Sequence, residues 1–427
     1  MTAMRILAAV LLTVRFAAAA PHGDFDQGVL VTPLLEDARQ SAKTAPDEGA
    51  LWISLGSSDL VMARATGLPL GSPVRASDSV AVFEVSPDLL PRLSDFMHET
   101  FGRCGGFFAY RTRVEAESAL SARTATKGGA YTLDQQAWVA PLVSRVSEGE
   151  IRSTIETLAA YQNRYYTADS GVEAARWLHG RWSALAAGLP GASSRLVKHG
   201  GWKQPSVVLT ITGAEKPDEI VILGGHLDSI NGYRGSAARA PGADDNASGI
   251  AVLTEVVRVL GASGLRPRRT IQFMGYAAEE VGLRGSQDLA KQAAREGRKV
   301  IGVIQFDMTN FKGAGSGIFL LNDYVDPGLT AFLGKLIEAY ADVPWSTTKC
   351  GYACSDHASW TKSGYPAAAA FESSVETMNR SIHTDRDTLA ASGGSAQHSV
   401  AFAKLAVAFA VELAKTSPVL ELTSQKR

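Results

Sequence analysis

The sequence predicts an α/β fold in which helices cover both faces of a central sheet. From Tyr131 onward, short apolar runs alternate with amphipathic helical runs, and this alternation is typical of α/β domains. Acidic residues and histidines directly follow several of the apolar runs, as expected of a site at the carboxyl ends of sheet strands. The chain before Tyr131 has a different pattern and predicts a separate, small α+β unit.

The predicted strands of the larger part are apolar runs of strand length. They are Val207–Thr212, Ile220–Leu223, Thr270–Ala277, Val300–Phe306, Ile318–Leu321 and Ala367–Phe371. Between them, the run 251–260 has apolar residues at i, i+3, i+4 and i+7, which places them on one buried helix face. Those residues are Leu253, Val256, Val257 and Leu260. Runs 282–297 and 328–341 are similar and also predict helices.

Composition excludes several classes of protein. The chain has 427 residues, 45% hydrophobic and 20% charged, which is a globular composition and argues against disordered or fibrous chains. With 42 Lys and Arg against 43 Asp and Glu, the net charge is −1, so charge gives no reason to expect a nucleic-acid or membrane partner. No later run reaches the roughly 18 apolar residues of a transmembrane helix.

The first twenty residues predict a signal peptide. Arg5 lies in a basic start, residues 6–14 are almost wholly apolar, and residues 17–20 are small, which is the order of a secretory signal. We therefore expect a secreted protein, with the periplasm as the alternative, and a monomer.

Residues 21–128 are predicted to form a propeptide domain with a linker. Runs Leu51–Leu55 and Val80–Val85 predict strands, and Pro87–Phe101 predicts a helix. The stretch 111–129 is rich in Arg, Ala, Ser, Thr and Gly and predicts an exposed linker, cleaved near 123–130. A folded unit between signal and linker indicates an intramolecular propeptide, and a permanent accessory domain is the alternative. The second domain is then 129–427.

Five segments place acids and histidines where strands should end or a helix should begin. They are 224–229, 241–249, 276–280, 306–308 and 381–384. Their candidate residues are His226, Asp228, Asp244, Asp245, Glu279, Glu280, Asp307 and His383. Singly, each has a structural alternative, such as a helix cap at Asp244 or a solvated helix start at Glu279. Together they suit Zn²⁺, which binds imidazole nitrogen and carboxylate oxygen. More acids than one metal needs suggest two metals about 3.5–4 Å apart.

These segments resemble the secreted bacterial leucyl aminopeptidases, dizinc exopeptidases of the wider family that includes glutamate carboxypeptidase II. The resemblance covers about 131–415 and extends to the loop from Cys350 to Trp360, which is distinctive of the subgroup. None of the metal positions is substituted. The resemblance implies a mixed, mostly parallel central sheet, two Zn²⁺ per chain, and removal of Leu-like residues from the N-termini of peptides or proteins.

The resemblance also implies a role for each metal ligand. His226 and Asp307 are the terminal ligands of one zinc, and Glu280 and His383 those of the other. Asp245 is the bridging carboxylate, with a cis peptide bond to Asn246. Asp244 receives a supporting role.

Three further residues carry catalytic roles by the same resemblance. Glu279 is the general base, Asp228 holds the ring of His226, and Tyr352 helps to hold the oxyanion. The local chemistry agrees, because a water acidified by two metals needs a carboxylate that is not itself a ligand to take its proton. Neighbouring Glu279 and Glu280 provide one free and one coordinated carboxylate.

An apolar pocket for the substrate side chain is implied as well, with core packing as the alternative for each residue. Its members are Met308, Leu321, Tyr352, Phe371, Val375, Met378 and Ile382. Because Ala369, Val375 and Met378 replace bulkier groups of close relatives, the preference among Leu, Met and Phe stays open.

The three cysteines divide into a pair and a single residue. The spacing of Cys350 and Cys354 also occurs in metal and redox sites, but in an exported protein it favours a disulfide. Cys104 lies in the part expected to be removed. The remaining histidines are assigned structural roles, five because they have no partners at useful spacing, and His357, which could pass for a ligand after Ser355 and Asp356, because the resemblance implies it. They are His22, His98, His179, His199, His357 and His398.

Three other functions compete with this interpretation. Glutaminyl cyclase has the same fold with one zinc, but the loop 350–360 argues against it. A non-catalytic, receptor-like relative should have lost ligands, and this chain has lost none. A serine hydrolase should carry a Gly-x-Ser-x-Gly turn, which this sequence lacks.

Overall fold

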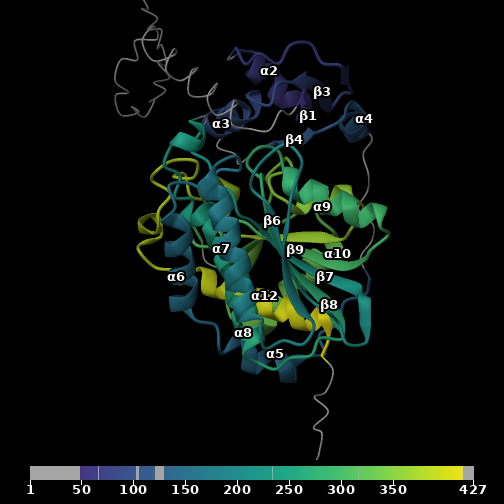
Figure 1. Cartoon of the computed structure of the whole chain (residues 1–427), viewed down its shortest axis with the longest axis vertical. Helices are drawn as coiled ribbons and strands as arrows, with labels where there is room; N and C mark the ends of the chain where they lie inside the picture. The colour runs from purple at the N-terminus through teal and green to yellow at the C-terminus, as the bar shows by residue number, and fades with distance from the viewer. Residues whose placement is uncertain are drawn as a thin grey trace, which may run out of the picture.

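The computed structural model describes most of the chain as two packed units (Figure 1). The described residues are 49–65, 67–101, 105–120, 129–232, 234–315 and 317–416. We call residues 49–120 of this set the N-terminal unit and residues 129–416 the C-terminal unit. The predicted signal peptide, Cys104 and residues 121–128 of the predicted linker lie outside the described residues.

The N-terminal unit is a small α+β sandwich of one antiparallel sheet and its helices. Its strands lie in the order β2-β3-β1-β4. Their bounds are β1 Leu51–Gly56, β2 Arg75–Ala76, β3 Val80–Val85 and β4 Phe107–Tyr110. Helix α2 spans Ser57–Ala65 and α3 spans Leu89–Phe101. The two predicted strands and the predicted helix are therefore present, because their apolar residues form one shared core.

The predicted linker begins with exposed residues, as expected, but then contains a short helix that was not predicted. Helix α4 (Arg113–Glu117) begins after Thr112, whose Oγ1 accepts a hydrogen bond from the amide of Glu115 at 3.3 Å. Thr followed three residues later by Glu is a capping signal, and Ala116 anchors the helix in an apolar cluster. A cap and one buried residue thus outweigh the polar composition.

The C-terminal unit is built on an eight-stranded sheet in the order β11-β10-β12-β9-β7-β8-β6-β5. Its strands are β5 Ala192–Val197, β6 Ser206–Ile211, β7 Lys216–His226, β8 Arg269–Tyr276, β9 Lys299–Phe306, β10 Ile318–Leu321, β11 Trp345–Thr348 and β12 Ala367–Phe371. The central four, β12, β9, β7 and β8, are parallel, and β10 pairs parallel with β11. The antiparallel pairs are β10 with β12, β6 with β8, and β5 with β6. The predicted mixed, mostly parallel sheet is confirmed.

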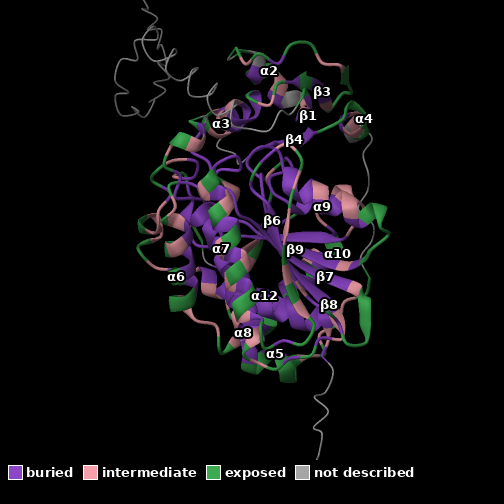
Figure 2. Ribbon diagram, viewed as in Figure 1, coloured by how far each residue is buried: buried purple, intermediate pink, exposed green. Residues whose placement is uncertain are grey.

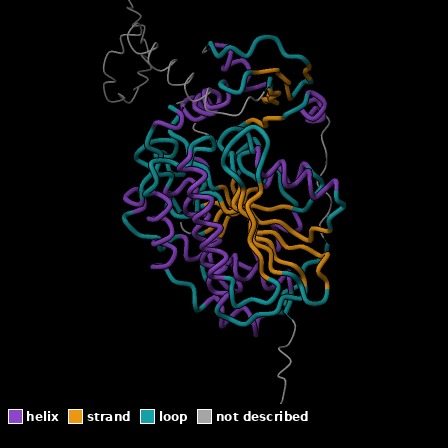
Figure 3. The backbone as a smooth tube through the Cα atoms, viewed as in Figure 1, coloured by secondary structure: helices purple, strands orange, loops and turns teal. Residues whose placement is uncertain are grey.

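Alternate residues of each central strand face opposite sides of the sheet. In β7, Val221 and Leu223 belong to one buried cluster and Ile220 and Ile222 to another. The first face is covered by α5 Gln136–Val143, α6 Glu148–Ala159, α7 Asp169–Leu185, α8 Gly249–Gly261, α10 Pro327–Leu336 and α12 Ser399–Ala414. The second is covered by α9 Arg284–Arg295 and α11 His357–Lys362. Figure 2 shows the strands buried, and Figure 3 shows them gathered between the helices.

Two edge strands and one helix end differ from the prediction. The half-exposed strands β5 and β11 mix polar and apolar residues, so they carry no apolar run. The helix predicted over 328–341 ends at Leu336 and continues as a wider π-type turn over Ile337–Ala341. Within the described part of the chain, no helix has the length and apolar character to cross a membrane.

Parallel strands bring the site to one edge of the sheet. Strand β7 ends at His226, which pairs with Tyr276 at the end of β8, and β9 ends beside β7 at Phe306. The acidic segments that follow β8 and β9 therefore emerge next to His226, as the strand-end argument predicts.

Candidate metal centre

The structure brings all five predicted metal ligands together. His226 is the last residue of β7, Glu280 lies in the turn after β8, and Asp307 follows β9. Asp245 lies in the turn that leads into α8, and His383 comes from the late loop after β12. All five side chains are buried.

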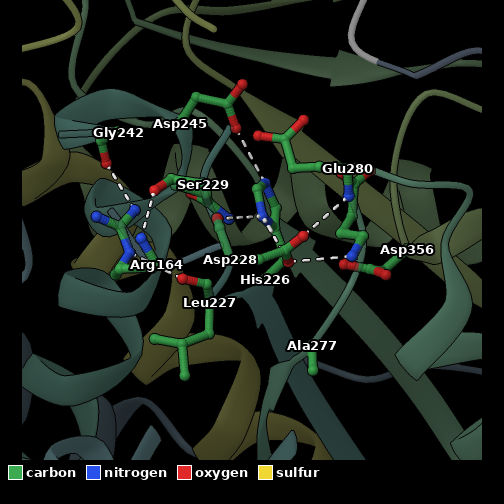
Figure 4. Close-up of polar contacts among 12 residues, drawn as sticks. Arg164, His226, Leu227, Asp228, Ser229, Gly242, Asp245, Ala277, Glu280 and Asp356 are labelled. Carbon is green, nitrogen blue, oxygen red and sulfur yellow. Dashed lines mark hydrogen bonds and ion pairs between the residues drawn. The ribbon is translucent and has the colours of Figure 1, made fainter. Parts of the chain in front are cut away.

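Asp245 lies between the two histidines, with one carboxylate oxygen toward each (Figure 4 labels Asp245, His226 and Glu280). Its Oδ1 is 3.0 Å from Nε2 of His226, and its Oδ2 is 3.2 Å from Nε2 of His383. On the outer sides, Asp307 Oδ1 is 3.2 Å from His226 Nε2, and Glu280 Oε2 is 2.8 Å from His383 Nε2. The five side chains therefore form one continuous row of donor atoms.

These residues fit divalent cations. Both carboxylate oxygens of Glu280 are buried, and Oε2 faces Nε2 of His383, itself a predicted metal ligand, at 2.8 Å. Burial and the charge of Asp245 raise the pKa of Glu280 to about 7. Burial and the charges of Asp307, Asp356 and Glu280 likewise raise that of Glu279 far above its ordinary value. Such a buried cluster of acids is costly unless cations offset its charge. Imidazole nitrogen with carboxylate oxygen is a zinc donor set.

Asp228 supports the site in two ways. Its carboxylate accepts hydrogen bonds from the backbone amides of Glu279 at 3.0 Å and Glu280 at 3.2 Å. Toward His226, its carbonyl oxygen is 3.2 Å from Nδ1, whereas its carboxylate is 3.6 Å away. The predicted contact with the ring of His226 is thus made chiefly by the backbone, and the side chain holds the turn of the two glutamates.

The bridging segment is held by side-chain contacts that the sequence did not predict. The Asp245–Asn246 peptide bond is cis, as predicted. The Asn246 amide nitrogen donates to the carbonyl of Phe306 at 2.9 Å, and the carboxylate of Asp387 accepts the backbone amides of Asp244 and Asp245. No spacing rule marks Asn246 or Asp387, because their partners are distant in sequence.

Arg164 joins two of the ligand-bearing loops (Figure 4). It is fully buried, and its Nε donates to the carbonyl of Leu227 at 2.8 Å while Nη2 donates to that of Gly242 at 2.8 Å. Burial lowers its pKa to about 10, so it stays charged at neutral pH. This cation beside the acidic group was also missed by the sequence analysis, since single arginines carry no pattern.

An apolar pocket opens beside Asp307. Its lining includes the predicted Met308, Leu321, Tyr352, Phe371, Val375 and Met378, together with Ala369 and Ser355. Ile382 does not line it but packs in the same apolar cluster. The predicted disulfide between Cys350 and Cys354 is present and borders the pocket. The hydroxyl of Ser355 donates to Oδ2 of Asp307 at 2.5 Å, another contact without a sequence signal.

Comparison with known proteins places this site in a family. The family model described as "Peptidase family M28" matches residues 206–408. A leucine aminopeptidase 1 of Grosmannia clavigera is 40% identical over 362 residues, covering 80% of this chain and 87% of the relative. The chain belongs to peptidase family M28.

Solved structures agree with this assignment. The LapA aminopeptidase of Legionella pneumophila has a TM-score of 0.76 and 30% identity, and the match covers 86% of this M28 peptidase and 99% of LapA. The glutaminyl cyclase of Porphyromonas gingivalis, at 17% identity and a TM-score of 0.51, covers 62% of this chain and 97% of its own. That second likeness concerns the fold alone.

In this M28 peptidase the N-terminal unit packs onto the turn that carries Glu279 and Glu280. The amide of Ala109 donates to the carbonyl of Gly282 at 3.1 Å, and Ala278 and Val281 belong to the core of the N-terminal unit. His98, assigned a structural role from the sequence, has its ring against that of His383. Only tertiary packing brings these two histidines together.

Proposed function

We propose that this M28 peptidase is a dizinc aminopeptidase that removes hydrophobic, Leu-like residues from the N-termini of peptides and proteins. The observation that carries the proposal is the position of Asp245, with one carboxylate oxygen toward each of two histidines. The name of the Grosmannia relative, a leucine aminopeptidase, supports the reaction class.

In this proposal His226 and Asp307 would hold one zinc ion, His383 and Glu280 would hold a second, and Asp245 would serve both. Two bound Zn²⁺ would supply Lewis acidity, which lowers the pKa of water toward about 7 and polarises the scissile carbonyl.

Glu279 acts as the general base and then as the general acid. It takes a proton from the attacking water and passes it to the departing amine, as a carboxylate outside the ligand set can. Its backbone amide is held by Asp228, which limits the freedom of the turn. Tyr352 lines the pocket, and its hydroxyl would donate a hydrogen bond to the developing oxyanion.

The apolar pocket would select the first side chain of the substrate. It is lined by Met308, Leu321 and Phe371 and lies against Asp307, so a bound Leu side chain would bring its peptide bond to the ligand group. Apolar pockets of this kind select by size.

We also propose that the chain is a secreted monomer made as a precursor, with the periplasm as the alternative location. Residues 1–20 would be the signal peptide and 21–128 the propeptide, cleaved in the stretch between the two described units. The packing of Ala109 on Gly282 supports inhibition of the unprocessed chain.

Hydrolysis of Leu-p-nitroanilide and of its N-acetyl analogue tests the function. We expect the chain cleaved after the N-terminal unit to hydrolyse only the free amine, to bind two zinc ions, and to lose activity with 1,10-phenanthroline. Cyclisation of N-terminal Gln by a chain with one zinc would instead identify a glutaminyl cyclase.

A further inference from the structure

The N-terminal unit places an imidazole against the candidate metal centre. His98 lies in the last turn of α3, and its ring centroid is 4.8 Å from that of His383, with the ring planes inclined by 42°. His383 directs Nε2 toward Asp245 and Glu280. A residue from outside the C-terminal unit thus lies directly beside one ligand of the proposed second zinc.

One nitrogen of His98 is buried and has no hydrogen-bond partner among the described residues. This atom is Nδ1. Buried polar atoms nearly always have a partner, and an orphaned one calls for an explanation such as an ion. A neutral imidazole nitrogen with its lone pair available is the commonest metal donor in proteins.

The position of α3 is determined by packing of the residues that precede His98. Leu93, Phe96 and Met97 are buried in a cluster shared with Tyr165 and Ile230 of the C-terminal unit. This shared core holds the helix against the site, so the approach of His98 does not depend on its own side chain.

One glycine of the C-terminal unit allows α3 to come this close. At Gly232, with φ +50°, an added Cβ would lie 2.5 Å from Oδ1 of Asp95, one turn before His98 on α3. Beside α3, Gly106 lies against the pocket wall, because a Cβ added there would be at ordinary contact distance, 3.5 Å, from the ring of Tyr352. The N-terminal unit therefore lies against the pocket wall as well as against His383.

We infer that His98 is a metal ligand of the unprocessed chain. This inference rests on the proposed function. In the unprocessed chain, Nδ1 of His98 would bind the zinc held by His383 and Glu280, at the position that the α-amine of a substrate would use. The unprocessed chain then has three imidazoles for two zinc ions, and removal of the N-terminal unit leaves two. Inhibition thus combines coverage of the pocket with occupation of a coordination position.

The first experiment counts imidazoles without any substitution. Zinc X-ray absorption spectroscopy on the full chain and on the processed chain reports the scattering of imidazole ligands. We expect three imidazoles per two zinc ions in the full chain and two after processing. Equal counts in the two forms would overturn the inference.

The second experiment separates ligation from ring packing in the full chain. His98→Phe keeps a ring beside His383 but has no donor nitrogen, His98→Ala removes the ring as well, and Glu99→Gln changes an exposed neighbour on the same helix. With Co²⁺ in place of zinc, we expect the visible absorption spectrum to change in both His98 variants and to stay unchanged in Glu99→Gln. Release of zinc to excess chelator should be at least about tenfold faster in His98→Phe, the low end for loss of a metal-site contact.

The outcomes distinguish this inference from the proposed function. The processed chain contains no His98, so its zinc content and its hydrolysis of Leu-p-nitroanilide judge the proposed function alone. If that chain is active with two zinc ions, while full-length wild type and His98→Phe give the same cobalt spectrum and release rate, the inference is wrong and the proposed function stands. A chain that binds no divalent metal overturns both.

Discussion

The carboxylate of Asp228 accepts a hydrogen bond from the backbone amide of Glu279 at 3.0 Å. The residue predicted to hold a metal ligand thus also holds the turn of the proposed general base. It also accepts the amide of Glu280, so one buried side chain controls the positions of both glutamates relative to His226.

Replacing Asp228 by Asn should reduce catalysis more than substrate binding. The amide keeps one acceptor oxygen but exchanges the other for a donor that faces the amide of Glu279 or Glu280. We expect kcat for Leu-p-nitroanilide to fall by about 10–100-fold, typical of residues that support a metal site, with KM nearly unchanged. Asp218→Asn, an exposed change at the other end of β7, is the control. A fall confined to KM would contradict this role.

Replacing Glu279 by Gln should abolish proton transfer without loss of metal. Among the described residues, the ion pairs of His226 and His383 do not include Glu279, so zinc content should stay at the wild-type level. A general base contributes about 10²–10⁴-fold to the rate, and we expect kcat to fall by at least about 100-fold. Turnover and zinc content are measured together, with the surface variant Glu296→Gln as control. Near-normal turnover would remove Glu279 from the mechanism.

Replacing Ser355 by Ala should weaken metal binding through Asp307. The Ser355 hydroxyl donates to Oδ2 of Asp307, leaving Oδ1 toward His226. Loss of this orienting bond should raise the zinc dissociation constant by about tenfold or more, measured by competition with a chelator. Ser363→Ala, a change at the end of α11, should have no effect. If both variants bind zinc as the wild type does, Ser355 has no orienting role.

Enlarging Ala369 should change the substrate preference. Ala369 lies in β12 and lines the apolar pocket, so Ala369→Leu would fill space that a substrate side chain needs. A clash of one or two methylene groups is worth about 10–200-fold in discrimination. We expect the ratio of kcat/KM for Leu- over Ala-p-nitroanilide to drop by about tenfold or more. An unchanged ratio would show that this pocket does not hold the first side chain.

The ligand set could be predicted from sequence because it obeys strand-end logic. His226 and Asp307 follow apolar runs that can only be neighbouring strands of a buried sheet, and such ends converge. Contacts such as Ser355 with Asp307, or His98 with His383, join segments with no shared pattern. Their partners are determined by packing, which no local spacing reports.

The same distinction explains the errors in secondary structure. The edge strand β5 needs no apolar run, because one side of it faces solvent. Helix α4 depends on a cap at Thr112 and on Ala116 being buried against the C-terminal unit. In both places the polar composition indicates solvent exposure and does not indicate the strand or helix. Each element forms because of a few tertiary contacts.

Docking of the N-terminal unit should strengthen as pH rises above neutrality. The Nζ of Lys362 lies over the rings of Phe108 and Tyr110, at 4.4 and 4.3 Å from their centroids. Burial lowers the pKa of Lys362 to about 7 from its ordinary value of 10.5. Between these values the docked lysine is neutral and the undocked one is charged, so docking releases a proton. The docked state therefore becomes more stable as pH rises and less stable as pH falls toward 7.

The measurement uses the full chain cleaved once between the two units. We expect the N-terminal unit to dissociate more readily at about pH 7.5 than at about pH 9.5. Dissociation is measured by size-exclusion chromatography and by the appearance of Leu-p-nitroanilide hydrolysis. This window lies above the range in which His98 and Asp95 titrate, since burial lowers the pKa of His98 to about 4 and raises that of Asp95 to about 6. Lys362→Met keeps the apolar stem but cannot titrate, so its dissociation should be independent of pH in this window. If Lys362→Met retains the full pH dependence of the wild type, another group controls release.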